Sequence, residues 1–236
     1  MSDLTYTDFL ADLGVGGAHP GSLRLTKNII NTLDITDTST VLDVGCGTGQ
    51  SAYYIANRYG CQTYALDKNS TMIQKAKSRL MNNQSLPLTF LQGNAEILPF
   101  SDNTFDFIFS ESVTSFTNYE LSLNEYARVL KPSGTLILVE MTKRQHLSEQ
   151  EIAEIKDFYG MTTIFAEEEW RDNLTKVGFT TINTEDIPLT NEPTQMEFNY
   201  SEDLTTEHFD VMNKHHFLTE KYVTKLSAKV YYCKFS

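Results

Sequence analysis

Three glycines at alternate positions follow an apolar run that ends at Val44: Gly45, Gly47 and Gly49. A strand that ends in such a turn and leads into a helix, expected here over 50–58, brings backbone amides close to a nucleotide-like ligand. The spacing is G-x-G-x-G rather than G-x-G-x-x-G, and no Lys-Ser or Lys-Thr pair follows the glycines as in a P-loop. The turn therefore predicts a ligand site at the end of a buried strand.

An acidic side chain is expected close to the glycine turn, at the same edge of the sheet. Asp67 ends the strand predicted over 62–66, and its two carboxylate oxygens suit the two neighbouring hydroxyls of a ribose. Asn69 or Ser70 then caps a helix whose apolar face includes Met72. Taken by itself, Met72 is better explained as an ordinary core residue.

Two further segments continue the alternation of strands and helices. The strand predicted over 88–92 runs into a Gly-Asn-Ala-Glu turn at 93–96, and a second turn with a fourth strand follows over 98–110. The segment 125–140 has the pattern of a helix that is stopped by Pro132 and followed by a fifth strand. Such alternation is typical of a parallel sheet covered by helices.

In this order, between residues 40 and 141, the segments resemble the motifs of class I S-adenosylmethionine-dependent methyltransferases. The resemblance implies S-adenosylmethionine as the cofactor, with Asp67 at the ribose and Met72 on the adenine. The family usually has an acid where this chain has Asn94, whose side-chain oxygen accepts the same hydrogen bond without a charge. The residues implied at the cofactor are Asp43, Gly45, Cys46, Gly47, Gly49, Gln50, Asp67, Lys68, Met72, Asn94, Ala95, Glu96 and Glu111.

The N-terminal segment carries one more stretch of this kind. Its glycine-rich residues 14–18 lead into His19-Pro-Gly, and Ser22 is the expected cap of a helix. This stretch resembles the H-P-G segment that precedes the glycine turn in some bacterial small-molecule methyltransferases, where it lies across the mouth of the active site. The segment 111–116 resembles the same subgroup. The alternative is a helix-capping turn with His19 in solvent.

Methyl transfer from a sulfonium is an in-line displacement, in which positioning and exclusion of water supply much of the rate. The resemblance places Glu111 and His19 on either side of the methyl group, as candidate catalytic residues that remove a substrate proton. A hydrogen bond to the cofactor or to the H-P-G segment is an equally good role for Glu111. The aromatic candidates for stabilising the sulfonium are Tyr6, Phe9, Phe116 and Tyr200.

The composition of the chain excludes some classes of substrate and location. The 31 acidic and 19 basic residues give a net charge of −12, which argues against nucleic acid as the substrate. No apolar run is long enough to span a membrane, and the polar start does not match a signal peptide. Three cysteines, an odd number without a CxxC pair, suggest reduced thiols and a cytoplasmic location. For Cys46, a small side chain in a tight turn is a better reading than a nucleophile.

The histidines near the C-terminus, His208, His215 and His216, raise the question of a metal site. In a helix, His208 and His215 would lie about 10 Å apart along the axis, too far for one ion. We therefore expect no metal, and histidines on a helix surface or in a pocket wall.

We expect one α/β domain over residues 1–236, with a Rossmann-like, seven-stranded, mostly parallel sheet, helices on both faces and an added helical cap. The resemblance implies that the last strand, over 228–235, inserts antiparallel between the fifth and the sixth, which is expected over 179–187. Helices are expected over 148–159, 167–177 and 202–226, the last possibly broken near His215. The cap consists of residues 1–33 and 188–227, unless these only pack on the outside of the sheet.

The functional prediction is an S-adenosylmethionine-dependent methyltransferase acting on a small molecule. One alternative is a non-catalytic protein that binds an S-adenosyl ligand, against which the aromatic cap argues. A second is an NAD-type Rossmann oxidoreductase, which the glycine spacing and the Leu-Lys-Pro-Ser-Gly segment at 130–134 disfavour. The accepting atom and the oligomeric state stay open at this point.

Overall fold

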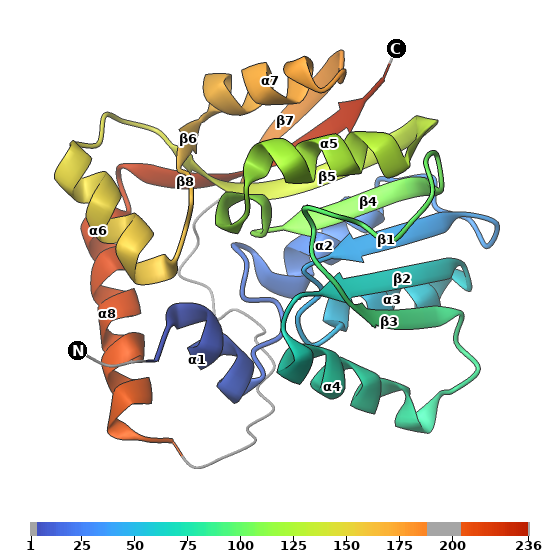
Figure 1. The fold of residues 1–236 in the computed structure, drawn as a ribbon, viewed down its shortest axis with the longest axis horizontal. Coiled ribbons are helices and arrows are strands. Elements are labelled where there is room, and N and C mark those ends of the chain that lie inside the picture. The colour runs from blue at the N-terminus through green and yellow to red at the C-terminus, as the bar shows by residue number, and fades with distance from the viewer. Residues whose placement is uncertain (1–3, 188–203, 236) are drawn as a thin grey trace.

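The computed structural model describes residues 4–187 and 204–235. In these two ranges, seven long strands and one two-residue strand form a mixed sheet (Figure 1). The strands are β1 (Thr40–Val44), β2 (Gln62–Asp67), β3 (Leu88–Gln92), β4 (Phe105–Glu111), β5 (Leu130–Lys143), β6 (Phe165–Ala166), β7 (Thr181–Ile187) and β8 (Leu226–Lys234). The helices are α1 (Tyr6–Leu13), α2 (Ser22–Ile30), α3 (Gln50–Tyr59), α4 (Ser70–Ser78), α5 (Tyr119–Val129), α6 (Glu149–Tyr159), α7 (Glu167–Lys176) and α8 (Thr206–Tyr222), with short turns of helix η1 (Arg79–Asn82) and η2 (Thr114–Phe116).

The sheet has the order β3-β2-β1-β4-β5-β8-β7, and β6 pairs with β5 outside this path. The strands from β3 to β5 are parallel, whereas β8 pairs antiparallel with both β5 and β7. The predicted Rossmann-like sheet and the antiparallel insertion of the last strand are therefore confirmed. The short parallel strand β6 was not expected, because two residues carry no periodic pattern.

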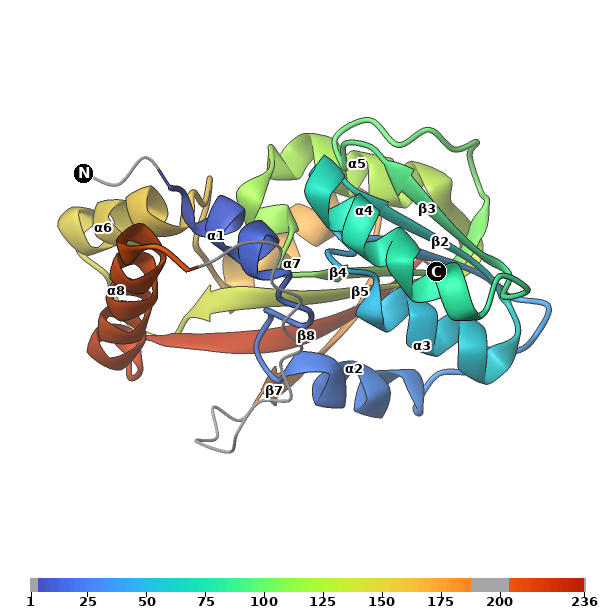
Figure 2. The same ribbon diagram turned by 90° about the horizontal axis from the view of Figure 1, so that it is seen from below.

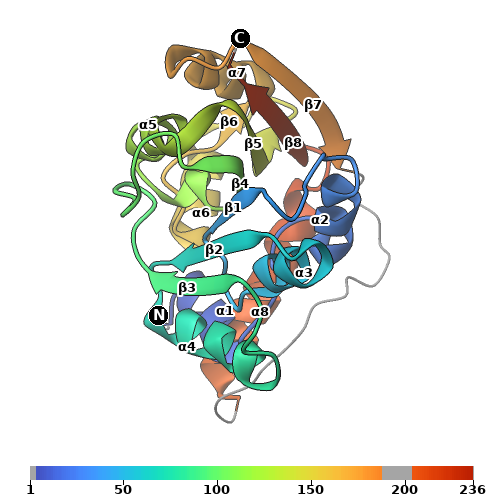
Figure 3. The same ribbon diagram turned by 90° about the vertical axis from the view of Figure 1, so that its right-hand side faces the viewer.

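Helices cover both faces of the sheet, as expected. Tyr126 of α5 and Trp170 of α7 are fully buried on one face, where they pack over β4, β5 and β8. On the other face, Ile30 of α2 and Ile55 of α3 pack over β1 and β5, and Ile73 of α4 joins α3 over β2 and β3. Figures 2 and 3 show α5 on one side of the strands and α2 and α3 on the other. Because both faces are covered, the middle of the central strands is rich in buried apolar residues, such as Val41, Ile108 and Ile137.

The cap differs in composition from the prediction. Helices α1, α6 and α8 gather beyond the end of the sheet (Figure 1), with Phe9, Tyr159 and Leu218 among their buried contacts. The sequence assigned α6 to the sheet domain, and it assigned α2 to the cap, although α2 packs on the sheet. Residues 188–203, which complete the second predicted cap element, lie outside the described residues.

The cap is attached to the sheet domain at the ends of its helices. Lys75 of α4 donates from Nζ to the carbonyl oxygens of Ala11 and Asp12, at 2.8 Å each. These carbonyls belong to the last turn of α1, where the helix dipole favours a positive charge. The interaction therefore fixes α1 against α4, beside the carboxyl end of β2.

Three local predictions have different outcomes. Of the two predicted caps of α4, Asn69 is the one observed, accepting from the amides of Thr71 and Met72. Ser22 does not cap α2, because Gly21 (φ 82°) is the cap and Ser22 is the first helical residue. Helix α8 is continuous through His215, so the predicted break is wrong.

One buried carboxylate connects the centre of β5 to the turn η2. Glu140 is 1% exposed, and its Oε1 accepts from the amides of Val113 and Thr114 while its Oε2 accepts from the hydroxyl of Ser115, at 3.2, 2.8 and 2.6 Å. Burial raises the pKa of Glu140 to about 7, although these hydrogen bonds oppose the shift. The side chain thus fixes the turn that follows β4.

We expect the stability of the protein to fall as Glu140 ionises. Because its folded pKa lies above the unfolded value, its contribution is complete below about pH 4.5 and is lost as the pH rises through about 7. Between those limits the free energy of unfolding should fall by up to about 3 kcal/mol relative to a Glu140→Gln variant, which has no such ionisation. Urea unfolding of both proteins across this range measures the difference. Parallel pH profiles would contradict the expectation.

Candidate functional site

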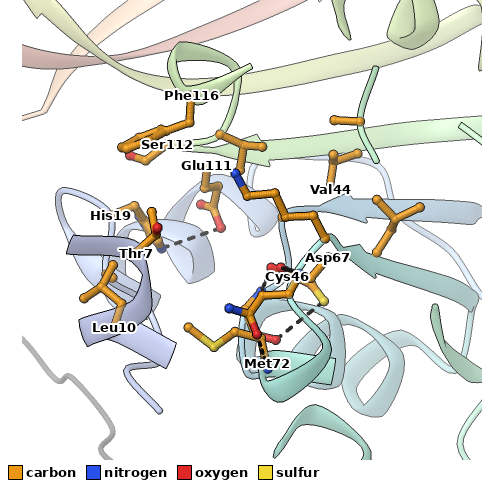
Figure 4. A pocket seen from close by; sticks show the side chains of 18 of the residues that line it. Thr7, Leu10, His19, Val44, Cys46, Asp67, Met72, Glu111, Ser112 and Phe116 are labelled. Atoms are coloured by element: carbon orange, nitrogen blue, oxygen red, sulfur yellow. Dashed lines mark hydrogen bonds and ion pairs between the residues drawn. The ribbon is translucent and has the colours of Figure 1, made fainter. Parts of the chain in front are cut away.

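The carboxyl ends of β1, β2 and β4 open onto a cavity of about 410 Å³ (Figure 4). The strand order reverses at β1, since β2 lies on one side of it and β4 on the other, and such a point is where open α/β sheets bind ligands. Helix α1 and the segment after it close the opposite side. The lining residues from the sheet domain are Asp43, Val44, Gly45, Cys46, Gly47, Gln50, Ser51, Leu66, Asp67, Lys68, Asn69, Met72, Gly93, Asn94, Ala95, Glu111, Ser112, Val113, Phe116 and Thr117.

The glycine turn between β1 and α3 has a left-handed backbone at each glycine, with φ of 68°, 52° and 74°. A Cβ on Gly45 would lie 2.2 Å from Val113, and one on Gly49 would lie 2.4 Å from Phe90. A Cβ on Gly47 would meet no atom within 4 Å. Two of the glycines therefore serve the packing of the protein itself, whereas Gly47 faces open space and lines the cavity.

Asp67 lies at the tip of β2, as predicted. Its Oδ2 accepts from the amide of Gly47 and its Oδ1 from the amide of Asn69, both at 2.8 Å. Each oxygen therefore keeps capacity for a second donor from the cavity. Burial raises the pKa of Asp67, and the two backbone hydrogen bonds oppose that shift.

Two buried acceptors in the wall have no hydrogen-bond partner among the described residues: Asp43 Oδ2 and Gln50 Oε1. Burial raises the pKa of Asp43, and the nearby charges of Glu111 and Asp67 add to the effect. An unpaired buried acceptor costs about 1–3 kcal/mol, so both atoms call for a donor. They lie on either side of the glycine turn in the sequence and both residues line the cavity.

Most of the residues predicted at the cofactor line this cavity, but two do not. Gly49 lies behind the turn against Phe90, and Glu96 accepts from the amide of Asn118 at the start of α5. Asn94 does line the cavity, and its Oδ1 already accepts from the amide of Glu96 at 3.0 Å. Burial raises the pKa of Cys46 well above its ordinary value, which makes this thiol a poor nucleophile.

The two candidate catalytic residues are neighbours rather than partners across the cavity. His19 Nε2 lies 3.6 Å from Glu111 Oε2, and both side chains are about 6% exposed. His19 is therefore not in solvent, and the expectation that the two residues flank the methyl group from opposite sides is wrong. Figure 4 shows both side chains between β4 and the N-terminal segment. Thr26 and Ser51, which were not predicted from the sequence, donate hydrogen bonds to Glu111.

The far wall of the cavity is largely apolar. Of the four predicted aromatic residues, Tyr6 and Phe116 line it, Phe9 is buried without lining it, and Tyr200 lies outside the described residues. The ring of Tyr6 packs edge-on against Tyr159 at 4.8 Å between centroids, and burial raises the pKa of its hydroxyl. The N-terminal lining residues are Tyr6, Thr7, Asp8, Leu10, Val15, Gly17, Ala18 and His19.

The C-terminal histidines have separate partners. His208 lies 3.5 Å from Asp12, and His215 pairs with the hydroxyl of Tyr159 at 3.0 Å. His216 is exposed beside Glu220. In the part of the chain that the structure describes, no group of three histidine, cysteine or acidic side chains is arranged to hold a metal, and no helix is long and apolar enough to cross a membrane.

Comparisons with known proteins agree with this geometry. A family model described as a methyltransferase domain matches residues 42–138, a range that begins within β1 and ends within β5. The chain is 26% identical over 207 residues to phosphoethanolamine N-methyltransferase of Plasmodium falciparum, covering 84% of this chain and 76% of that protein. Phosphoethanolamine N-methyltransferase 2 of Haemonchus contortus, solved with S-adenosyl-L-methionine, has a TM-score of 0.77 at 19% identity, covering 98% of this chain and 57% of that one. That likeness shows a shared fold.

A more similar relative establishes the family. The chain is 36% identical over 223 residues to the uncharacterized methyltransferase YodH of Bacillus subtilis, and the match covers 92% of this chain and 93% of that protein. Identity of this extent along nearly the whole of both proteins reflects common descent. The chain therefore belongs to the class I family of S-adenosylmethionine-dependent methyltransferases.

Proposed function

We propose that this enzyme methylates a small molecule that binds between α1 and the turn η2, next to the S-adenosyl cofactor. One observation carries the proposal: a single cavity joins the polar ends of β1 and β2 to a wall formed by Tyr6, Leu10 and Phe116. Its volume of about 410 Å³ lies within the range of small-molecule pockets. Such a cavity has room for a compact acceptor rather than for a macromolecular chain.

The residues present fit the cofactor. Asp43 Oδ2 and Gln50 Oε1 have no donor in residues 4–187 and 204–235, and an S-adenosyl ligand offers donors in its ammonium group and its ribose hydroxyls. Asp67 keeps acceptor capacity for the ribose, and Met72 with Asn94 would flank the adenine. Gly47 leaves open space where a ligand would approach the backbone.

S-adenosylmethionine supplies a methyl group that is activated by a positively charged sulfur. The protein must then hold the accepting atom in line and exclude water, and positioning of this kind accounts for much of the rate. The aromatic faces of Tyr6 and Phe116 are suited to stabilising a nearby cation. Leu10 and Val15 extend the apolar surface, which favours an acceptor with an apolar or aromatic body.

We further propose that the enzyme works in the cytoplasm on a free metabolite. The three cysteines are unpaired in the structure, which agrees with a reducing compartment. The net charge of −12 disfavours a nucleic acid as the acceptor.

The cofactor assignment predicts a binding pattern. We expect S-adenosylmethionine and S-adenosylhomocysteine to bind in the micromolar range, about −8 kcal/mol, and NAD to bind far more weakly. Titration calorimetry with the three ligands tests this. Binding of NAD alone would overturn the assignment, and release of S-adenosylhomocysteine in a screen of small metabolites would identify the acceptor. Cofactor binding without turnover on any acceptor would favour a binding protein instead.

Substitution of Gly47 should selectively lower the affinity for the cofactor. A Gly47→Ala variant adds a methyl group in the open space of the cavity, and we expect affinity for S-adenosylhomocysteine to fall about tenfold or more. The matched control is Gly60→Ala, because Gly60 also has a positive φ (66°) and open space around it but lies outside the cavity lining. Because both positions have a positive φ, each substitution should lower the free energy of unfolding by about 1–2 kcal/mol. Equal cofactor affinities in the two variants would show that the turn does not contact the ligand.

A further inference from the structure

Four polar side chains from distant parts of the sequence meet at the end of β4. Glu111 accepts from the hydroxyl of Thr26 on Oε1 at 2.8 Å and from the hydroxyl of Ser51 on Oε2 at 3.1 Å. His19 Nε2 lies 3.3 Å from Thr26 Oγ1 and 3.6 Å from Glu111 Oε2. Thr26 is fully buried in α2, and Ser51 lies in the first turn of α3. The cluster therefore joins two helices and the segment before α2 to one carboxylate.

The contacts of its two ring nitrogens show how His19 is held. Thr26 has one hydroxyl proton, which it donates to Glu111, and its Oγ1 lies 3.3 Å from His19 Nε2. The other ring nitrogen, His19 Nδ1, lies 3.2 Å from the carbonyl oxygen of Pro20. Each ring nitrogen therefore has a neighbouring oxygen atom, one in α2 and one in the segment before it.

This arrangement uses most of the hydrogen-bonding capacity of the pair. A general base needs a lone pair directed at the proton that it removes. Glu111 accepts from Thr26 and Ser51, and both ring nitrogens of His19 lie beside oxygen atoms of other residues. The pair is therefore better suited to holding structure than to taking a proton from an acceptor.

The pair holds the segment 14–21 in place. The backbone of this segment has positive φ at Gly14, Gly17 and Gly21. The next residue, Ser22, also has a positive φ, of 50°, which is a strained conformation for a residue other than glycine. Such a conformation persists only where surrounding contacts enforce it. A Cβ on Gly16 would lie 2.9 Å from the hydroxyl oxygen of Thr48, so the segment also lies directly against the glycine turn.

We propose that Thr26, Glu111 and Ser51 are positioning residues that hold His19, and through it the segment 14–21, against the cofactor turn. Within this assignment, which rests on the proposed function, Glu111 and His19 are not the base of the reaction. The segment supplies Val15, Gly17 and Ala18 to the cavity wall. Its position therefore determines the shape of the site next to the glycine turn.

The first experiment reads the contact between His19 and Glu111. In protein labelled with ¹⁵N at histidine, the ring nitrogens of His19 are assigned with a His19→Gln variant. In Glu111→Gln, the amide oxygen can still accept from Thr26, while its NH₂ group replaces a carboxylate oxygen beside Nε2, so the Nε2 shift of His19 should change. Ring shifts that are the same in wild type and Glu111→Gln would overturn the assignment. Exposed His216 should give identical shifts in both proteins.

The second experiment separates positioning from general stability. Thr26→Val removes the hydroxyl at nearly constant volume, and Thr26→Ser keeps it. Thr63→Val removes a buried hydroxyl of β2 that hydrogen bonds to Cys61 rather than to the cluster. We expect Thr26→Val to speed hydrogen exchange in residues 14–26 and to weaken S-adenosylhomocysteine binding roughly tenfold. Thr26→Ser should restore both, and Thr63→Val should change neither.

The outcomes distinguish the two proposals. If the wild type does not bind S-adenosylhomocysteine, the proposed function fails, whereas the exchange and ring-nitrogen results still test the cluster. If the wild type binds and Thr26→Val matches Thr63→Val in exchange and affinity, the positioning role fails. Once an acceptor is found, a Glu111→Gln variant that keeps cofactor affinity but loses ~10²-fold or more in kcat would restore Glu111 as the base.

Discussion

The rest of the site depends on one constraint, the close packing of neighbouring side chains against the glycine turn after β1. Val113 on one side and Phe90 on the other leave no space for a Cβ at Gly45 or Gly49, so the turn can bend only where glycines stand. That bend brings the amide of Gly47 to Asp67 and starts α3 with Gln50 in the cavity wall. The strand order then brings acids from β2 and β4 to the same edge.

The wall of the cavity contains buried polar atoms that are not paired. Among the described residues, Asp43 and Gln50 each carry a buried acceptor without a donor, and Asp43 lies near the charges of Glu111 and Asp67. Buried polar atoms in a packed interior are normally paired, and both of these residues line the cavity. The ligand that supplies the donors therefore stabilises the fold as well as occupying the site.

The sequence predicted what depends on local pattern and missed what depends on distant contact. The glycine turn, Asp67 at its strand end and the Asn69 cap are consequences of neighbouring residues, and each appears where expected. Thr26 and Ser51 are ordinary helix residues in the sequence, and only the tertiary fold brings them to Glu111. Likewise, α6 carries no mark of a cap helix, since its amphipathic pattern suits any apolar neighbour.

The contact between Lys75 and the last turn of α1 has a consequence for how the two walls of the cavity are coupled. Helix α4 carries both Met72, in one wall, and Lys75, which holds α1 in the opposite wall. In the proposed arrangement, a cofactor that restrains the first turn of α4 also restrains α1, where the acceptor would bind. Coupling of this kind is reciprocal: the factor by which bound cofactor raises the affinity for the acceptor equals the factor by which bound acceptor raises the affinity for the cofactor.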